Sequence, residues 1–292
     1  MLELIEASAA QLEAAGLTFE NGFGQGTTNA FDEAAWLVMW QLGLPLDDLD
    51  SVQKRPVAQA ERAQVATLLG ARIRTRQPAA YLTHEAWLMG VSFYVDERVI
   101  IPRSFIAELL VDESIDPWLG EDTRRVLDLC TGNGSLAVLA AMTYPDVLVD
   151  AADISLDALA VARINVDKHA LGSRITLIES DGLAACHGLT NGGYDLILCN
   201  PPYVNAASMA ALPAEFKAEP ALALGGGSDG MDFIRSLFLT AAAQMNENAV
   251  LVLEIGNERE NFERAFPQLE PLWFETSAGS DQVMLITREQ LV

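Results

Sequence analysis

The residues with the greatest chemical potential are Asn200, Pro201, Pro202 and Tyr203, which follow a predicted strand over 195–198. A residue that precedes proline is pushed towards extended geometry, so Asn200 should project from the end of that strand. Neither proline donates a backbone hydrogen bond, and their carbonyl groups stay free as acceptors. The Asn200 side-chain oxygen and the Pro201 carbonyl could then hold both hydrogens of a planar, amide-type nitrogen, with Tyr203 as an aromatic wall. Taken alone, the four residues could equally form a turn after a strand.

Two acceptors in this arrangement would assist a nitrogen that is a poor nucleophile. The lone pair of an amide nitrogen is delocalised into its carbonyl group. As the nitrogen attacks, its hydrogens become more positive, so hydrogen bonds to them strengthen in the transition state. This chemistry needs no metal and no histidine base. The sequence has only three histidines and three cysteines, none of them in a C-x-x-C pair, and we predict no metal site.

A second candidate site lies in the segment 128–135, where a predicted strand leads into a helix. Gly132 and Gly134 would let the backbone approach a nucleotide closely, because a Cβ would obstruct it. The helix that follows presents free N–H groups at its start. Together with Ala137, the two glycines also match the spacing of the dinucleotide fingerprint, so NAD is an alternative ligand here.

Acidic residues follow the next two predicted strands. Asp153 could accept hydrogen bonds from both hydroxyl groups of a ribose, or it could serve only as an acid at a helix N-terminus. Asp181 could accept from an adenine amino group, although Asp-Gly is also a common turn dipeptide. The predicted cofactor-binding residues are Asp128, Thr131, Gly132, Gly134, Asp153, Ile154, Asp181, Gly182 and Asn200.

The elements that position these residues alternate between strands and helices from residue 125 onward. Repeated βα units predict a doubly wound α/β sheet with helices on both faces, whose strand ends bind ligands. Strands are expected over 126–129, 147–153, 175–178, 195–198 and 250–253, helices over 135–144, 155–171 and 231–244, and an antiparallel pair over 272–275 and 283–287.

The first 84 residues are predicted to form a small helical domain. Apolar residues recur there at helical spacing to about residue 75, with Pro45 between two helical segments. Beyond Gly90, Val91 and Phe93 alternate with polar residues, which indicates a β-hairpin. We therefore expect a helical domain over 1–84 and a larger domain over 85–292 that begins with this hairpin.

The composition limits the possible partners. The chain has 292 residues and a formal net charge of −23. Such a surface repels phosphate backbones and attracts basic partners, although it could also serve only solubility. No apolar run reaches the ~18 residues that a membrane helix needs, and the acidic N-terminus is unlike a signal peptide. We expect a cytoplasmic protein with no direct nucleic-acid or membrane binding.

The motif residues described above resemble the protein-glutamine N5-methyltransferase family (HemK type), and the similarity covers nearly the whole chain. Within that family the sequence is most similar to the ribosomal-protein type (PrmB type). The segments that carry this closer similarity are 31–50, 93–98, 101–104 and 128–132.

The resemblance implies a Rossmann-like methyltransferase sheet behind a small helical N-terminal domain. It implies S-adenosyl-L-methionine as the cofactor, held by the glycine loop and the strand-end acids, and a target glutamine held by Asn200, Pro201, Pro202 and Tyr203. The implied substrate is a glutamine of the large-subunit ribosomal protein three, a basic protein. The segment 219–230 would then lie beside the substrate with its three consecutive glycines as a hinge, or it could be simply a flexible loop.

Two positions depart from the family pattern. Cys130 stands where many methyltransferases have the first glycine of the loop, so the turn must form without that freedom; a cysteine here is typical of the PrmB type. Phe105 follows Ser104 where a smaller residue or a proline is expected.

Three other functions share parts of the pattern. A release-factor glutamine methyltransferase would share the four residues from Asn200 and most of the cofactor residues. An adenine N6-methyltransferase would face the same problem of a delocalised lone pair, but the negative charge argues against a nucleic-acid substrate. A nicotinamide-dependent dehydrogenase would account for the glycine loop and leave Asn200 to Tyr203 unexplained.

Overall fold

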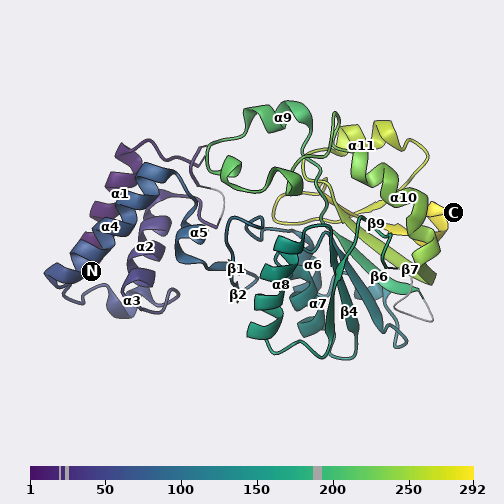
Figure 1. The fold of residues 1–292 in the computed structure, drawn as a ribbon, viewed down its shortest axis with the longest axis horizontal. Helices are drawn as coiled ribbons and strands as arrows, with labels where there is room; N and C mark the ends of the chain where they lie inside the picture. The colour runs from purple at the N-terminus through teal and green to yellow at the C-terminus, as the bar shows by residue number, and fades with distance from the viewer. Residues whose placement is uncertain (20, 24–25, 187–192) are drawn as a thin grey trace.

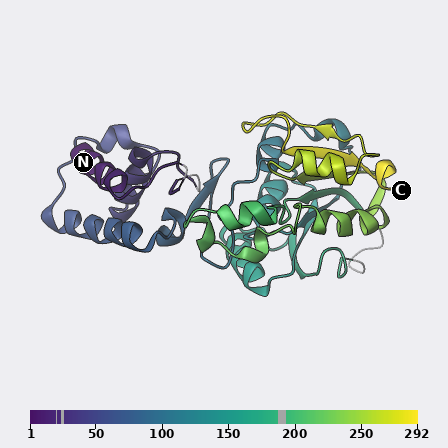
Figure 2. The same ribbon diagram turned by 90° about the horizontal axis from the view of Figure 1, so that it is seen from above.

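The computed structural model of the chain describes residues 1–19, 21–23, 26–186 and 193–292. Two parts lie side by side along the long axis in both views of Figures 1 and 2. One is built of helices from the first 83 residues, and the other is an α/β part around a central sheet. No helix among the described residues is both long enough and apolar enough to cross a membrane.

The N-terminal part contains α1 (Leu2–Ala14), α2 (Ala30–Gln41), α3 (Leu49–Val52), α4 (Gln59–Thr75) and α5 (Ala79–Thr83). The helical prediction for this region is confirmed, and the helices bury a common apolar core. Leu37 of α2 and Leu69 of α4 lie in a common core with Leu12 of α1. Pro45 lies between two helical segments, as predicted. The helix α2 ends at Gln41, before the proline. A domain boundary at residue 84 stays a prediction.

The central sheet has the order β5-β4-β3-β6-β7-β9-β8. The strands β3 (Arg125–Leu129), β4 (Leu148–Asp153), β5 (Ile175–Glu179), β6 (Tyr194–Cys199) and β7 (Met245–Glu254) pair in parallel. The last two, β8 (Leu272–Trp273) and β9 (Val283–Thr287), are the predicted antiparallel pair, and β9 joins the sheet at β7. Chain order reverses at β3 and β6, where ligands bind in open α/β sheets.

Helices cover both faces of this sheet, which confirms the doubly wound prediction (Figure 1). On one face lie α6 (Ile106–Val111), α7 (Ser135–Thr143) and α8 (Leu156–Lys168); on the other lie α10 (Asp232–Gln244) and α11 (Arg259–Ala265). Successive residues of a strand point to opposite faces. Accordingly, Val126 packs into the first core and Leu127 into the second.

Two predicted boundaries are wrong by more than two residues. The helix expected over 155–171 is capped by Ser155, whose side chain accepts from the Ala158 amide, but it ends at Lys168. The chain turns at Ala170, which has a φ of 56°, before it reaches Gly172. The strand expected over 250–253 begins at Met245, because Met245 already pairs with Tyr194 across a register shift.

The predicted hairpin consists of β1 (Ala86–Leu88) and β2 (Val91–Phe93), which are antiparallel. Beyond it, Asn165 of α8 anchors the chain to the α/β part. The Asn165 Oδ1 accepts from the Tyr94 amide at 2.7 Å and its Nδ2 donates to the Tyr94 carbonyl at 3.0 Å.

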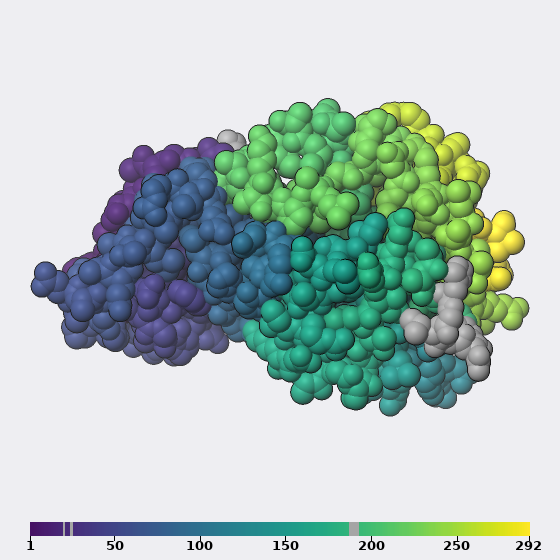
Figure 3. Space-filling view, viewed as in Figure 1, coloured from purple at the N-terminus to yellow at the C-terminus, as the bar shows by residue number. Residues whose placement is uncertain are grey.

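Residues 204–230, which we call the bridging segment, connect β6 to α10 and lie between the two parts of the molecule (Figures 1, 2 and 3). They contain α9 (Ala206–Ala211) and the 3-10 turns η2 (Phe216–Ala218) and η3 (Ala221–Ala223). Towards the helical part, Glu215 pairs with Arg72 at 3.2 Å and with Arg76 at 2.6 Å. The bridging segment is thereby tied to α4.

Candidate active site

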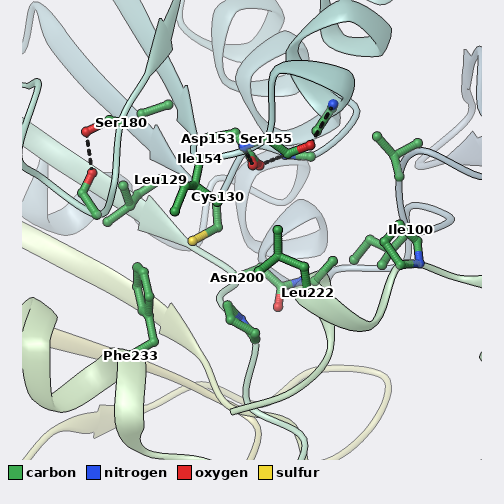
Figure 4. Close-up of a pocket in the computed structure, with 18 of the residues that line it drawn as sticks. Ile100, Leu129, Cys130, Asp153, Ile154, Ser155, Ser180, Asn200, Leu222 and Phe233 are labelled. Atoms are coloured by element: carbon green, nitrogen blue, oxygen red, sulfur yellow. Dashed lines mark hydrogen bonds between the residues drawn. The ribbon is translucent and has the colours of Figure 1, made fainter. Parts of the chain in front are cut away.

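A cavity of about 240 Å³ opens at the carboxyl ends of β3, β4, β5 and β6 (Figure 4). The residues that directly follow each of these strands line the cavity, as expected for ligand sites of open α/β sheets. Of the predicted site residues, those that line the cavity are Gly132, Asp153, Ile154, Asp181, Gly182, Asn200 and Pro202. The structure thus brings together residues from four separate strand ends.

The loop after β3 turns without a glycine at its first position. Cys130 has a φ of 62°, in the left-handed region that glycine occupies more easily. A hydrogen bond with Cys199 and burial raise the pKa of the Cys130 thiol. Gly132, with a φ of 56°, lines the cavity, and a Cβ added there would meet no protein atom within 4 Å. This space is therefore open to a ligand.

Asp128, Thr131 and Gly134 shape this loop from outside the cavity lining. The buried Asp128 carboxylate accepts from the Thr131 hydroxyl and, at 3.0 Å, from the Ala137 amide at the start of α7. Burial raises the pKa of Asp128 to about 7. A Cβ at Gly134 would lie 3.1 Å from the Cβ of Ala162, so this glycine lets the loop pack closely on α8.

Asp153 joins the loops that follow β3 and β4. One carboxylate oxygen accepts from the Gly132 amide and the other from the Ser155 amide, both at 2.9 Å. The pKa of Asp153 is raised, because the effect of burial exceeds the opposite effect of these backbone hydrogen bonds. Next to it, the Ile154 side chain is 50% exposed and forms an apolar part of the cavity wall.

Asp181 and Gly182 follow the strand β5 at another side of the cavity. Asp181 is exposed, so its carboxylate is accessible to a ligand. The turn here is fixed by Ser180, whose hydroxyl donates to the Gly182 carbonyl at 2.7 Å and accepts from the Ala185 amide at 3.0 Å.

Asn200 follows β6 directly and lines the cavity, as the sequence predicted (Figure 4). Its side chain forms no hydrogen bond with any other residue that the structure describes. Pro202 also lines the cavity, whereas Pro201 is buried. The Asn200 amide group is therefore available to a ligand, on a backbone held by two prolines.

The sequence predicted that Tyr203 forms an aromatic wall of the site. In the structure Tyr203 lies outside the cavity lining. Its hydroxyl donates to the Glu254 carboxylate at 3.3 Å. The ring and backbone are enclosed so closely that glycine is required around them. A Cβ at Gly256 would lie 2.6 Å from the Tyr203 ring, and one at Gly226 would lie 2.7 Å from the Tyr203 Cα. Tyr203 thus holds the turn after Asn200 from behind.

Glu254 ends β7 and connects this turn to the chain before α6. It is buried, and burial raises its pKa to about 7. Its second oxygen accepts from the Ser104 hydroxyl at 2.6 Å and from the Phe105 amide at 2.9 Å. A proline at position 105 would have no N–H for this bond. The bond accounts for the absence of proline here, and the Phe105 side chain packs, partly buried, against the first core.

Several cavity residues are not among the predicted site residues. They are Arg98, Val99 and Ile100 before α6, Pro220, Leu222 and Ala223 of the bridging segment, and Phe233 at the start of α10. Figure 4 shows Phe233 and Leu222 on the side opposite Asp153 and Ser180. The family resemblance had placed the segment 219–230 beside the substrate, and Arg98 belongs to the segment 93–98 that also carries the resemblance. Val99, Ile100 and Phe233 are identified only by their tertiary placement.

The cavity combines apolar walls with a few polar groups. Its walls are apolar at Leu129, Ile154, Leu222 and Phe233, and its polar groups are at Asp153, Asp181 and Asn200. Gly132 leaves room for close approach to the loop backbone. Among the described residues there is no cluster of histidine, cysteine and acidic side chains that could hold a metal ion.

Comparison with known sequences identifies the kind of protein that this chain resembles. Residues 107–228 match the family model described as the methyltransferase small domain. A protein of Bordetella pertussis named ribosomal protein uL3 glutamine methyltransferase is 50% identical over 291 residues, which cover 99% of this chain and 95% of that protein. A protein of the same name from Neisseria meningitidis serogroup A is 51% identical, over 92% of this chain and 88% of that protein.

Comparison with solved structures supports the fold. The hMettl16 catalytic domain in complex with MAT2A 3'UTR hairpin 1 superimposes with a TM-score of 0.52 at 15% identity, covering 78% of this chain and 80% of that chain. At this identity the similarity shows only that the α/β part has a methyltransferase fold.

Proposed function

The chain belongs to the family of ribosomal protein uL3 glutamine methyltransferases, and from this membership we propose that it methylates the side-chain amide nitrogen (N5) of a glutamine in ribosomal protein uL3. The observation that carries the proposal is the placement of Asn200. Its amide lies at the cavity wall without a hydrogen-bond partner in the described chain, at the position where the sequence predicted a grip on a planar amide.

We assign the cofactor S-adenosyl-L-methionine to the cavity beside Asn200. When bound, it supplies the methyl group that the glutamine nitrogen takes up, while the carbon–sulfur electron pair stays on sulfur. Asp153 would accept from the ribose hydroxyls, and Asp181 from the adenine amino group. Gly132, Ile154 and Gly182 would contact the nucleoside, and Asp128, Thr131 and Gly134 would hold the loop in shape.

The protein's contribution to the transfer is orientation and hydrogen bonding. The Asn200 side-chain oxygen and the Pro201 carbonyl would accept from the two amide hydrogens of the glutamine. These hydrogen bonds strengthen as the nitrogen becomes positive, which lowers the barrier rather than merely binding the ground state. The nitrogen then releases one proton to solvent. Pro202 and Tyr203 would keep the two acceptors fixed.

The choice of substrate rests on the relatives and on charge. The relatives are named for uL3. A chain with a net charge of −23 favours encounter with a basic ribosomal protein over encounter with a phosphate backbone. We accordingly place the protein in the cytoplasm, where ribosomal proteins are made, and retain the prediction of no direct nucleic-acid binding.

The first test concerns Asn200. We predict that Asn200→Ala slows methyl transfer about a hundredfold or more, because one preorganised transition-state contact is lost, and leaves cofactor affinity nearly unchanged. Single-turnover transfer and calorimetry with S-adenosylhomocysteine measure the two quantities. The matched control is Asn257→Ala, an exposed asparagine outside the cavity. A parental rate for Asn200→Ala would show that Asn200 is only a turn residue.

The second test compares substrates side by side with labelled cofactor. We expect uL3 to be labelled in preference to release factors, DNA and RNA. Preferential labelling of release factors would overturn the ribosomal assignment. Labelling of a nucleic acid would overturn the protein substrate altogether.

A further inference from the structure

A second cavity, of about 680 Å³, lies where the N-terminal helices meet the β1–β2 hairpin, apart from the candidate active site. Its apolar wall is formed by Trp36, Trp40, Leu44 and Leu46 on one side and by Trp87 on the other. We call this cavity the tryptophan groove. Trp87 is 49% exposed, which is unusual for a side chain with so much apolar surface.

We infer that the tryptophan groove binds a segment of the substrate uL3, in which an apolar side chain stands beside lysine or arginine. This inference rests on the proposed function, because it names the same substrate. It adds a docking site for the protein chain away from the modified glutamine.

The charge of the groove selects a basic occupant. Asp47 and Glu85 belong to the lining, which contains no lysine or arginine. Neither acid has an ion-pair partner among the described residues. Glu85 accepts from the Trp87 indole at 2.8 Å, which places a carboxylate at the edge of an aromatic ring. Such a pair suits a cation that can contact the ring face and the carboxylate together.

Trp36, which lines the groove, carries a buried polar atom that is unpaired among the described residues. The Trp36 Nε1 is buried and has no hydrogen-bond partner in the part of the chain that the structure describes. Buried donors are nearly always paired, and leaving one unpaired destabilises the free protein. This nitrogen has no exposed surface, so the docking of a peptide does not depend on it.

The tryptophan groove and the candidate active site are lined by neighbouring residues of one segment of chain. Val99 and Ile100 line the cofactor cavity, and the next two residues, Ile101 and Pro102, line the groove. The Ile101 amide donates to Glu219 at 3.0 Å, which fixes this chain against the bridging segment. Because consecutive Cα atoms are about 3.8 Å apart, the linings of the two cavities are adjacent at this segment.

The experiment measures methyl transfer to intact uL3 and to a short uL3 peptide around the modified glutamine. Trp87→Ala should raise the KM for intact uL3 about tenfold or more, because aromatic anchors dominate protein interfaces, and leave kcat within about twofold. The KM for the short peptide should not change. Trp87 is half-exposed on a hairpin, so thermal unfolding should show an intact fold.

Two further variants sharpen the test. Glu85→Gln keeps an acceptor for the Trp87 indole and removes the charge, so it should raise the KM for intact uL3 at low salt only. The control is Leu239→Ala, which removes a side chain that is 86% exposed on α10, outside the groove. Its KM should equal that of the parent.

The outcomes separate this inference from the proposed function. If the parent protein methylates uL3 and Trp87→Ala does so with the same KM, the groove is not a docking site, while the proposed function stands. If Trp87→Ala instead dissociates a dimer in sedimentation without changing the KM, the groove binds a second copy and the inference is overturned. If the parent protein does not methylate uL3, the proposed function fails and this inference fails with it.

Discussion

Among single residues, Asp153 has the most demanding position, because its carboxylate holds two loop amides and also faces the cavity. We predict that Asp153→Ala weakens S-adenosyl-L-methionine binding by roughly 1.5–3 kcal/mol, the scale of a lost hydrogen bond to a charged group. Asp153→Asn keeps one acceptor and should lose less. Calorimetry measures both, with exposed Asp157→Ala in the first turn of α8 as control. Equal affinities for all variants would contradict the ribose assignment.

A second buried residue, Glu254, should make stability depend on pH, because burial raises its pKa from 4.5 to about 7. Between pH 4.5 and about 7, the folded protein binds a proton that the unfolded chain has lost. The stabilisation from the protonated carboxyl is therefore complete below pH ~4.5 and is lost as the pH rises through ~7. Its size is on the order of 3 kcal/mol.

The variant Glu254→Gln tests this contribution. The amide cannot ionise and still accepts from Ser104 and Phe105, so the free energy of unfolding should fall less between pH 5 and pH 8 than in the parent. Urea unfolding at several pH values gives the comparison. Asp128, whose pKa is also raised to about 7, is present in both proteins, so its contribution to the pH dependence cancels in the comparison. Identical pH profiles would show that Glu254 stays ionised in the folded state.

At the scale of elements, the ion pair between Arg103 and Glu219 holds the bridging segment against the chain before α6. Arg103 binds the Glu219 carboxylate through both terminal nitrogens, at 2.6 and 2.7 Å, and Glu219 is only 4% exposed. Arg103→Met keeps the aliphatic stem and leaves the carboxylate buried without its partner. We predict a loss of about 3–5 kcal/mol in the free energy of unfolding.

The exposed pair Arg235–Asp229 provides the matched control for this prediction. Arg235 is 44% exposed, so Arg235→Met should cost no more than about 1 kcal/mol. Urea unfolding compares the two variants. Cofactor affinity should also fall in Arg103→Met, because Pro220 and Leu222 follow Glu219 into the cavity wall. If both variants lose equal stability, Glu219 does not hold the bridging segment.

At the scale of the whole molecule, the net charge of −23 should accelerate the encounter with a basic substrate. We predict that kcat/KM for intact uL3 falls as salt rises from about 50 to 500 mM, because the Debye length shrinks several-fold. A short peptide without net charge should show little dependence. The comparison is a steady-state assay at constant cofactor saturation. A flat salt profile for uL3 would mean that the acidic surface serves solubility alone.

The sequence by itself determined the parts of this protein that depend on local pattern. Alternation of βα units predicted the doubly wound sheet, and the order of Gly132, Asp153, Asp181 and Asn200 predicted a shared ligand edge. These predictions succeed because the carboxyl ends of parallel strands meet at one edge of a sheet, whatever the remaining contacts are.

Only the tertiary structure decided which loop residues line the cavity, which of them support the loop, and which distant residues complete the site. Asp128 and Gly134 belong to the same motif as Gly132, but they face α7 and α8 rather than the cavity. Phe233 reaches the cavity, and Glu254 reaches Tyr203, from segments that show no motif. A sequence pattern fixes neighbours along the chain, whereas these contacts depend on how separate elements pack, and packing follows side-chain shape rather than spacing.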